Sequence, residues 1–521
     1  MVFQQANWEE PLIYELSNGR RGLQFSSLND EFRQLLGDVK IPGDLSRSSP
    51  LNLPEASEVE VVRHFTRLSE MSYGVDNGPV PLGSCTMKYN PRIGLSFAYD
   101  DRLLNVHPLI SEEYVQGLLE MLYELQEWLK EITGMDACTL APAAGAQGEF
   151  VGTLMIKRYH DVKGQADVKN EIIVPDSAHG TNPASAAMAG FKVIEIPTAD
   201  DGNVDYEAFR SALGPRTAGF MLTNPSTLGL FEERILEISK DVHSVDGLLY
   251  YDGANLNGII GRARPGDMGF DIAHLNLHKT FSTPHGGGGP GSGPICIKDR
   301  EVKDGIKLSD LVPGAVVYYD SRDGLYKVKA MGAQAPGAVR PFLGNVPQLI
   351  WAFVYILSLG PQGLRKVGET SVLNTNYFVA KVKAETKYFS LPFSPSRPRK
   401  HEVVISAEPL LNKFGVSAED VSKYLLDQGL YAPTMYFPLI VREALMVEFT
   451  ESETKENIDK YVNALKAVEE IAEKNPDALK GLPSRTAVSR VDSVKANHPK
   501  SVTPTFRVYR ARLQGAQLIL R

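Results

Sequence analysis

Short apolar runs alternate with helical segments through the middle of the chain. Six runs have the length of strands and are rich in branched or aromatic residues, and helical segments, such as one expected at 205–213, separate several of them. This alternation is typical of an α/β domain with a largely parallel sheet, where ligands gather at the carboxyl ends of the strands. The six runs are 171–175, 192–197, 218–223, 248–252, 272–277 and 293–298.

The pattern changes on both sides of this region. Residues rich in Pro, Gly and Ser predict an extended N-terminal arm (1–95), and the large α/β domain (96–343) then opens with an amphipathic helix at 111–132. Longer helical patterns predict a smaller α+β C-terminal domain (344–485), followed by a basic, polar tail (486–521). The elements expected in the small domain are helices at 348–359, 373–386, 418–428 and 452–473, and strands at 401–406 and 444–449.

Composition and charge narrow the class of protein. The 521 residues are 43% hydrophobic and 23% charged, with a formal net charge of −8, which argues against a general nucleic-acid surface. The most apolar stretch, 349–359, is too short to span a bilayer, and the N-terminus lacks the features of a signal or transit peptide. Three cysteines without a CxxC pair argue against structural zinc and favour a reducing compartment, so we expect a cytoplasmic protein that binds no metal.

Three polar residues follow apolar runs in a suggestive order. Lys279 lies just after 272–277, where a lysine beside glycine-rich backbone can form a Schiff base with an aldehyde cofactor. Asp252 ends 248–252, and a carboxylate there can pair with a protonated pyridine nitrogen and keep the ring an electron sink. His179 follows 171–175 and can stack on a planar ring. Singly, each is more often a cap, turn or surface residue, but the three together are more specific.

Small residues provide a candidate phosphate site. The segment APAAGAQGE (141–149) precedes a helix expected at 150–159, and small residues let backbone N–H groups approach an anion at a helix N-terminus. A plain glycine- and alanine-rich turn explains this segment about equally well. The run HGGGGPGSG (285–293) precedes a strand and lacks the features of a nucleotide site, so we interpret it as backbone packed close to the cofactor or to another subunit.

Taken together, several segments resemble the P-protein family of the glycine cleavage system, the decarboxylating glycine dehydrogenases. The segments PLIYELSNGRRG and SRTAVSRVDSVKA resemble the half of that family that carries the cofactor lysine. The loop PLGSCTMKYNP, read alone, would be a surface loop with Cys85 buried, but it belongs to the same resemblance. The segments are 11–22, 81–91, 176–186, 250–259, 274–291 and 484–496.

The resemblance implies the pyridoxal-phosphate-dependent transferase fold of the aspartate-aminotransferase type (fold type I) and assigns residues to its site. Lys279 would hold pyridoxal 5'-phosphate as a Schiff base, Asp252 would pair with the pyridine nitrogen, and His179 would stack on the ring. The other assigned residues are Ala144, Gly145 and Ala146 at the phosphate, Thr223, Ala254 and His278 at the cofactor, and Ser84 and Thr86 in the substrate cleft.

The resemblance also implies a reaction and partners. Glycine would lose CO₂, and the aminomethyl group would pass to the lipoyl arm of H-protein, whose disulfide is the oxidant. The absence of a dinucleotide signature agrees with that chemistry. The partner would be a homologous subunit 1 without the cofactor lysine, in an α2β2 assembly, with no role for nucleic acid or membrane.

Other functions stay open at this point. The same scaffold serves aminotransferases, Cα-synthases and cysteine desulfurases, because fold does not fix function. A non-catalytic scaffold subunit is a second alternative, which the presence of Lys279 argues against. A nucleotide-binding module built on the glycine run is the weakest alternative. No arginine can be assigned to the substrate carboxylate.

Overall fold

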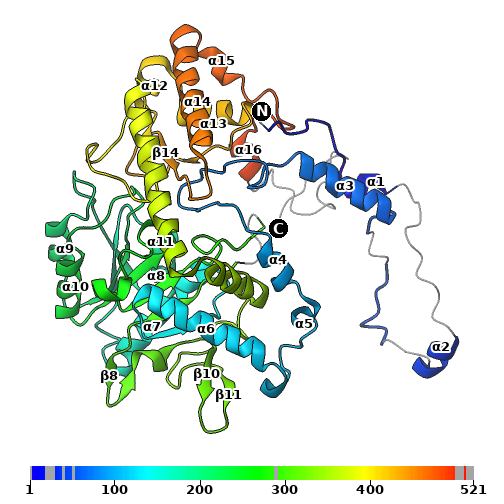
Figure 1. Cartoon of the computed structure of the whole chain (residues 1–521), viewed down its shortest axis with the longest axis vertical. Helices are drawn as coiled ribbons and strands as arrows, with labels where there is room; N and C mark the ends of the chain where they lie inside the picture. The colour runs from blue at the N-terminus through cyan, green and yellow to red at the C-terminus, as the bar shows by residue number, and fades with distance from the viewer. Residues whose placement is uncertain are drawn as a thin grey trace. The chain divides into compact units, whose positions relative to one another are not determined.

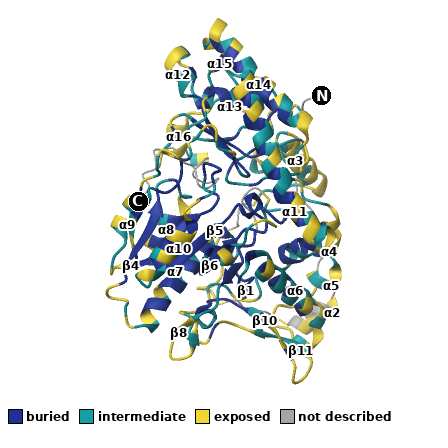
Figure 2. Cartoon of the chain, turned by 60° about the vertical axis from the view of Figure 1, so that its left-hand side comes forward, coloured by how far each residue is buried: buried dark blue, intermediate teal, exposed yellow. Residues whose placement is uncertain are grey.

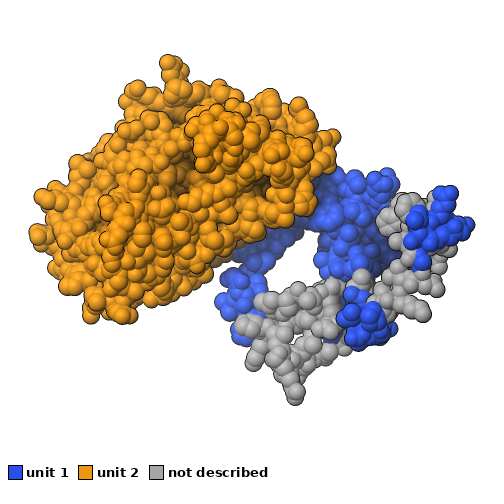
Figure 3. Space-filling model, turned by 90° about the horizontal axis from the view of Figure 1, so that it is seen from below, with its two compact units in different colours: residues 1–74, 427–429, 482–521 blue, residues 75–426, 430–481 orange. Residues whose placement is uncertain are grey.

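The computed structural model describes residues 3–17, 30–37, 42–49, 53–286, 291–498 and 510–511 (Figure 1). The chain forms two compact units, coloured separately in Figure 3. Unit 1 comprises Met1–Gly74, Asp427–Gly429 and Leu482–Arg521, and unit 2 comprises Val75–Leu426 and Leu430–Gly481. Every predicted site residue belongs to unit 2, while the finer boundaries expected at 95, 343 and 485 stay predictions.

Unit 2 is built around a seven-stranded sheet of order β1-β7-β6-β5-β4-β2-β3. The strands β3, β2, β4, β5 and β6 run parallel to one another. β7 runs antiparallel to β6, and β1 pairs antiparallel with β7, so β1 runs in the same direction as the five parallel strands. Six of the strands confirm the predicted runs, and β1 is a short strand that the pattern did not indicate. Their bounds are β1 Ala137–Thr139, β2 Glu171–Pro175, β3 Lys192–Ile196, β4 Thr217–Thr223, β5 Leu248–Gly253, β6 Ile272–Leu275 and β7 Ile295–Ile297.

Helices cover both faces of this sheet. All residues of β4 and β5 are buried, as Figure 2 shows in dark blue, which explains why these runs are apolar at nearly every position. The predicted helix at 111–132 begins later because a 3₁₀ turn occupies Glu112–Tyr114, and the helix predicted at 150–159 begins earlier, at Gly145. The helices are α6 Gln116–Thr133, α7 Gly145–Val162, α8 Thr181–Met188, α9 Tyr206–Ala212 and α10 Ile235–Ser244.

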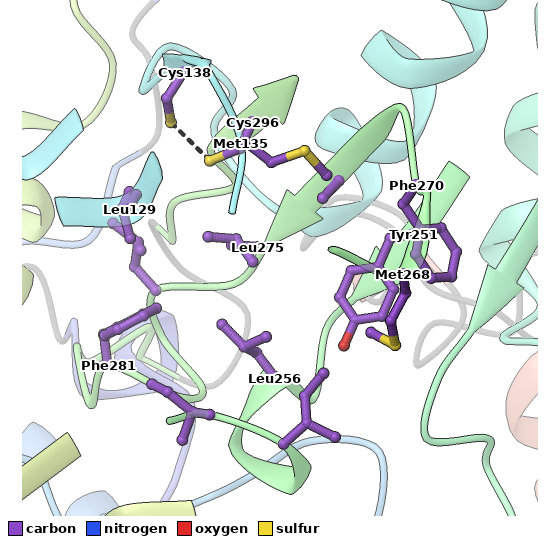
Figure 4. Packing of buried hydrophobic residues seen from close by; sticks show 14 of the residues in the cluster. Leu129, Met135, Cys138, Tyr251, Leu256, Met268, Phe270, Leu275, Phe281 and Cys296 are labelled. Atoms are coloured by element: carbon purple, nitrogen blue, oxygen red, sulfur yellow. Dashed lines mark hydrogen bonds between the residues drawn. The ribbon is translucent and has the colours of Figure 1, made fainter. Parts of the chain in front are cut away.

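The core consists of two apolar layers separated by the sheet. Alternate residues of a strand point to opposite faces, so Leu249 and Tyr251 of β5 join the layer that contains α6, while Tyr250 joins the layer that contains α7. Figure 4 shows part of the first layer, where Cys138 and Cys296 face each other across β1 and β7 with their sulfur atoms 3.0 Å apart. The parallel sheet with helices on both faces confirms the predicted α/β class.

A second, antiparallel sheet of order β12-β14-β13 forms the C-terminal part of unit 2. The two helices predicted at 348–359 and 373–386 lie on either side of a break within α11 at Gly360, whose φ of 61° and ψ of −177° are not helical, and the second helix begins earlier than predicted. Helix α11 packs against α6 and against α14 (Figure 1). The elements are α11 Val346–Glu385, β12 Val403–Ser406, α12 Glu408–Phe414, α13 Ala418–Asp427, β13 Thr434–Met435, β14 Ala444–Val447, α14 Lys455–Lys474 and α15 Asp477–Lys480.

Unit 1 contains short helices, as predicted for the N-terminal arm. Its N-terminal and C-terminal segments contact each other, as shown by a hydrogen bond of 2.6 Å that the Gln4 side chain donates to the Arg485 carbonyl. No helix in the described part of the chain is both long enough and apolar enough to cross a membrane. The helices of unit 1 are α1 Ile13–Leu16, α2 Asp30–Leu36, α3 Glu58–Glu70 and α16 Ser493–Asn497.

The central sheet should dominate the stability of unit 2. We expect Leu249→Ala to lower the free energy of unfolding by about 2–5 kcal/mol, because Leu249 is 0% exposed and its truncation leaves a cavity. The matched control is Leu236→Ala on α10, where the leucine is 66% exposed and the change should stay within about 0.5 kcal/mol. Denaturant unfolding of both variants measures this, and equal losses would contradict the assignment of β5 to the core.

Candidate functional site

The carboxyl ends of four parallel strands bring four of the predicted residues together. Thr223 is the last residue of β4, and Asp252 lies near the end of β5. His179 lies between β2 and α8, and Lys279 follows β6. Since β2, β4, β5 and β6 are parallel neighbours or next neighbours, their ends share one edge of the sheet, where ligands of such folds bind.

Asp252 is the most heavily bonded side chain of this site and is only 1% exposed. Burial raises the pKa of this carboxyl, but the imidazoles of His179 and His274 outweigh burial and hold the pKa well below its usual range. Asp252 therefore stays ionised although it is buried. Its hydrogen-bond donors are His179 Nδ1 (2.6 Å), Asn182 Nδ2 (3.0 Å), Thr223 Oγ1 (3.2 Å) and the Ala254 N–H (3.0 Å).

His179 links Asp252 to the loop of residues 81–91. Its Nδ1 bonds Asp252, and its Nε2 lies 2.8 Å from the Ser84 hydroxyl. Burial lowers the pKa of His179, but the adjacent Asp252 carboxylate outweighs burial and raises it above its usual value. The imidazolium form is therefore favoured. The Phe437 ring lies nearly parallel to the imidazole, with 6.3 Å between ring centroids.

Two buried groups that the sequence reasoning missed surround Asp252. Glu149 of α7 has a pKa raised to about 8 by burial and by the Asp252 charge. His274 of β6 has a pKa lowered to about 4, chiefly by burial. Both groups are therefore mainly neutral near pH 7, and Asp252 remains the main negative charge at this strand edge. A histidine inside the apolar run 272–277 was the available signal for His274.

The N-terminus of α7 forms a cradle that fits an anion. Ala144 is the N-cap and provides no side-chain cap, so the first-turn N–H groups, including those of Gly145 and Ala146, have no partner within the helix. A Cβ atom at Gly145 would lie 2.1 Å from the Asn276 side-chain oxygen, and one at Gly293 would lie 2.1 Å from the Ala144 carbonyl oxygen. Only glycine allows this close packing of backbone at the helix end.

Unpartnered polar atoms adjoin this cradle. Asn276 Oδ1 and His278 Nδ1 are buried and have no hydrogen-bond partner among the described residues. Burial lowers the pKa of His278 to about 3, so its imidazole is neutral and can accept or donate a hydrogen bond. Residues 287–290 of the glycine run lie outside the described residues. The open helix end and the orphaned polar atoms fit the phosphate and ring of pyridoxal phosphate.

The loop of residues 81–91 reaches the same region. Lys279 Nζ donates a hydrogen bond to the Ser84 carbonyl oxygen, which places Ser84 beside both Lys279 and His179. Thr86 is fully buried and bonds Asn255 Nδ2 and Glu448 instead of these residues. Burial raises the pKa of the Cys85 thiol between them. The structure thus brings Ser84, but not Thr86, into contact with the predicted catalytic residues.

Two groups of potential metal ligands occur in the described part of the chain. Glu149, Asp252 and His274 form one group, and His401, Glu402 and Glu448 form the other. Asp252, Glu402 and Glu448 already accept hydrogen bonds from protein donors. The predicted absence of a metal stays a prediction.

Comparison with known proteins decides the family. A family described as "Glycine dehydrogenase, C-terminal domain" matches residues 367–481. A protein of Aeropyrum pernix named "Probable glycine dehydrogenase (decarboxylating) subunit 2" is 62% identical over 515 residues, which cover 99% of each chain. The chain belongs to the glycine dehydrogenase (decarboxylating) subunit 2 family. A Staphylothermus marinus protein of the same name is 59% identical over 511 residues, 98% of each chain.

Solved structures confirm the fold. A crystal structure of glycine decarboxylase (P-protein) of the glycine cleavage system, in inhibitor-bound form, matches with a TM-score of 0.70 at 19% identity, over 85% of this chain and 100% of that chain. The cysteine desulfurase CsdA from Escherichia coli matches with a TM-score of 0.55 at 14% identity, over 75% of this chain and 94% of that chain. The predicted fold type I is therefore confirmed.

The raised pKa of Glu149 predicts that the stability of the chain depends on pH. Between pH 4.5 and about 8 the folded chain holds a proton on Glu149 that the unfolded chain has released. Stability therefore falls as pH rises through this window, by at most about 1.4 kcal/mol per pH unit for this one group. Glu149→Gln removes the titration and should flatten the profile.

Denaturant unfolding at several pH values between 5 and 8.5 measures this effect. The control is Glu237→Gln on the exposed surface of α10, which should leave the slope of the wild type unchanged. Identical slopes for the wild type and Glu149→Gln would show that Glu149 is not protonated in the folded chain.

Proposed function

We propose that this chain decarboxylates glycine with pyridoxal 5'-phosphate bound at the carboxyl ends of β2, β4, β5 and β6. The aminomethyl group that remains passes to the lipoyl arm of H-protein. The observation that carries the proposal is Asp252, a buried carboxylate that stays ionised at a strand edge beside His179, with Lys279 and an open helix end nearby. Relatives named glycine dehydrogenase subunit 2 support the choice of glycine.

Each group of residues would contact a different part of the cofactor. The first-turn amides of α7 would hold the phosphate, helped by the positive end of the helix dipole. Asp252 would pair with the pyridine nitrogen, and His179 would lie against the ring. Lys279 would bind the cofactor covalently through Nζ, after leaving the Ser84 carbonyl oxygen. The remaining proposed contacts are Ala144, Gly145, Ala146, Thr223, Ala254 and His278.

Loss of CO₂ from glycine leaves an electron pair on the α-carbon, and a protonated pyridine ring supplies the sink for that pair when the cofactor is bound. An ionised Asp252 keeps the ring nitrogen protonated, because the opposite charge favours the charged form. Ser84 and Thr86 would form the polar wall of the substrate cleft. A C–S bond then forms as the lipoyl S–S bond breaks, and the second sulfur is released as a thiolate that takes up a proton from solvent. The disulfide is the two-electron oxidant, so no nicotinamide is needed.

Partners follow from the same assignment. The designation "subunit 2" of the relatives supports a second, homologous subunit without the cofactor lysine. We propose an α2β2 assembly of the two subunits that acts on lipoylated H-protein in the cytoplasm, without nucleic acid or membrane.

The central test uses the full chain co-expressed with its partner subunit. We expect a visible absorbance with pyridoxal phosphate that borohydride bleaches, together with exchange of labelled CO₂ into glycine in the presence of lipoylated H-protein. Lys279→Ala should abolish the absorbance and lower exchange by roughly a thousandfold or more, because a nucleophile that acts covalently is lost. Lys298→Ala, a lysine 44% exposed on its side chain, is the matched control and should change neither.

Each other result has a defined meaning. Absorbance without exchange would move the reaction to an aminotransferase or a lyase on the same fold. No absorbance in the wild type would contradict the cofactor and leave a scaffold subunit as the better description.

The phosphate cradle gives an independent prediction. A Cβ atom at Gly145 would collide with the Asn276 side chain and push it into the space beside the first-turn amides. Gly145→Ala should therefore weaken pyridoxal phosphate binding by about tenfold or more, a cost of roughly 1.4 kcal/mol. Gly214→Ala has open space around its new Cβ and should bind normally. Fluorescence titration with the cofactor measures both, and equal affinities would place the phosphate elsewhere.

A further inference from the structure

Three alternate residues of the loop 81–91 are bonded to three acids from the C-terminal part of unit 2. The Ser84 N–H donates to Glu402 Oε2 over 2.6 Å, and the Thr86 N–H and hydroxyl both donate to Glu448 Oε2 over 3.1 Å. The Lys88 ammonium lies 2.5 Å from Glu451 Oε1. The loop that touches Lys279 and His179 is therefore held by side chains more than 300 residues away in sequence.

Two of these acids share one end of the small sheet. Glu402 directly precedes β12 and Glu448 directly follows β14, and the pairing of Val403 with Val447 brings the two acids opposite each other. Each is 1% exposed. Burial raises the pKa of Glu402, but the His401 imidazole and the Ser84 N–H outweigh burial and lower it. Glu402 is therefore ionised and accepts the Ser84 N–H as a charged group, which strengthens that bond.

The loop needs such support because of its backbone conformation. Ser84 has a φ of 68° and Thr86 a φ of 41°, both in the left-handed region that non-glycine residues seldom adopt. Strained residues of this kind persist where surrounding contacts fix them, and they concentrate at functional sites. In this loop the two buried carboxylates are among the fixing contacts, together with hydrogen bonds from Thr434 to the Gly83 carbonyl and from Lys279 to the Ser84 carbonyl.

Ser84 connects the carboxylate that holds the loop with His179 in the site. Its hydroxyl lies 2.8 Å from His179 Nε2, and His179 Nδ1 lies 2.6 Å from Asp252 Oδ2. The order of contacts is therefore Glu402, Ser84, His179, Asp252. An imidazole bonded at both nitrogens has a fixed ring orientation and a defined position for its protons.

We propose that Glu402 is a positioning residue, which holds the Ser84 hydroxyl on His179 Nε2 and so fixes the orientation and protonation of the imidazole beside Asp252. The inference deepens the proposed function, since this imidazole is the group that would lie against the cofactor ring. Glu402 itself touches neither Lys279 nor Asp252 through any hydrogen bond in the described part of the chain.

The protonation of His179 is the readout that separates this role from general stability. Besides Ser84, the charged and titratable groups that act on His179 are Asp252 on β5, Lys279 after β6, His274 on β6, Glu149 on α7 and Glu402 itself. Asp252 bonds Nδ1 of the His179 imidazole, whereas the Ser84 hydroxyl is the hydrogen-bond acceptor at Nε2. Loss of the Ser84 hydroxyl should therefore destabilise the imidazolium and lower the pKa of His179.

The experiment is a pH titration of the full, cofactor-free chain labelled with ¹⁵N-histidine and followed by NMR. The His179 signal is identified by its absence in His179→Asn. We expect Ser84→Gly to lower the pKa of His179 by about one unit, as loss of a hydrogen bond to a charged group implies. This variant should fold, because glycine readily adopts the φ of 68° found at this position. Glu402→Leu should lower the pKa at least as much.

Two further variants separate position from charge. Glu402→Gln keeps an acceptor for the Ser84 N–H but loses the charge, so it should lower the pKa of His179 less than Glu402→Leu does. The matched control is Glu469→Leu, which removes a buried carboxylate of α14 that accepts the N–H groups of Lys387 and Tyr388. It should destabilise the chain and leave the titration of His179 unchanged.

Defined results would overturn the inference. An unchanged pKa of His179 in Ser84→Gly would show that the Ser84 hydroxyl does not affect the protonation of His179. If Glu402→Leu and Glu402→Gln lowered the pKa of His179 equally, Glu402 would act on His179 only through its charge and not by positioning Ser84. Since the titration uses no cofactor, its outcome is independent of whether Lys279 binds pyridoxal phosphate, so failure of the inference and failure of the proposed function are distinguishable.

Discussion

The site depends on one constraint, which is that Asp252 carries a negative charge inside an apolar sheet. A buried carboxylate without partners would take up a proton, because desolvation disfavours the charged form. Four donors and the His274 imidazole prevent this, and these groups lie within or shortly after β2, β4, β5 and β6. The parallel sheet is what brings these segments to one edge. The charge of Asp252 is thus a property of the fold as a whole.

The protonation states of the groups around Asp252 are compatible with its negative charge. Near pH 7 Glu149 is mainly protonated and adds no second negative charge beside Asp252, and His274 is mainly neutral and adds no positive charge that would repel the His179 imidazolium. His179 in turn lies between Asp252 and Ser84, and Ser84 is held by Glu402. A carboxylate at the end of the small sheet is in this way connected to a carboxylate at the end of the large sheet through two side chains.

The sequence predicted the large sheet well because its strands are short, mainly apolar runs and helical segments separate several of them. It also predicted Lys279, Asp252 and His179 as one group, because residues that follow parallel strands share an edge. It could not predict β1, whose three residues give no pattern, or how close to Gly360 the second part of α11 begins. Glu402 and Glu448 were missed because their partners in the loop are far away in sequence, and only the pairing of β12 with β14 brings the two acids together.

The hydrogen bond from Lys279 to the Ser84 carbonyl has a consequence for the proposed binding of an aldehyde cofactor. The amine that would attack an aldehyde is engaged by a carbonyl oxygen of the loop, which cannot react with it. Any aldehyde that binds at this amine has to displace the hydrogen bond between Lys279 and the Ser84 carbonyl. Only an aldehyde that also interacts with the Asp252 carboxylate and accepts hydrogen bonds from the N–H groups of α7 would gain enough binding free energy to replace that bond. If Lys279 binds pyridoxal phosphate as proposed, selectivity for this aldehyde would therefore begin when the cofactor binds, before any substrate is present.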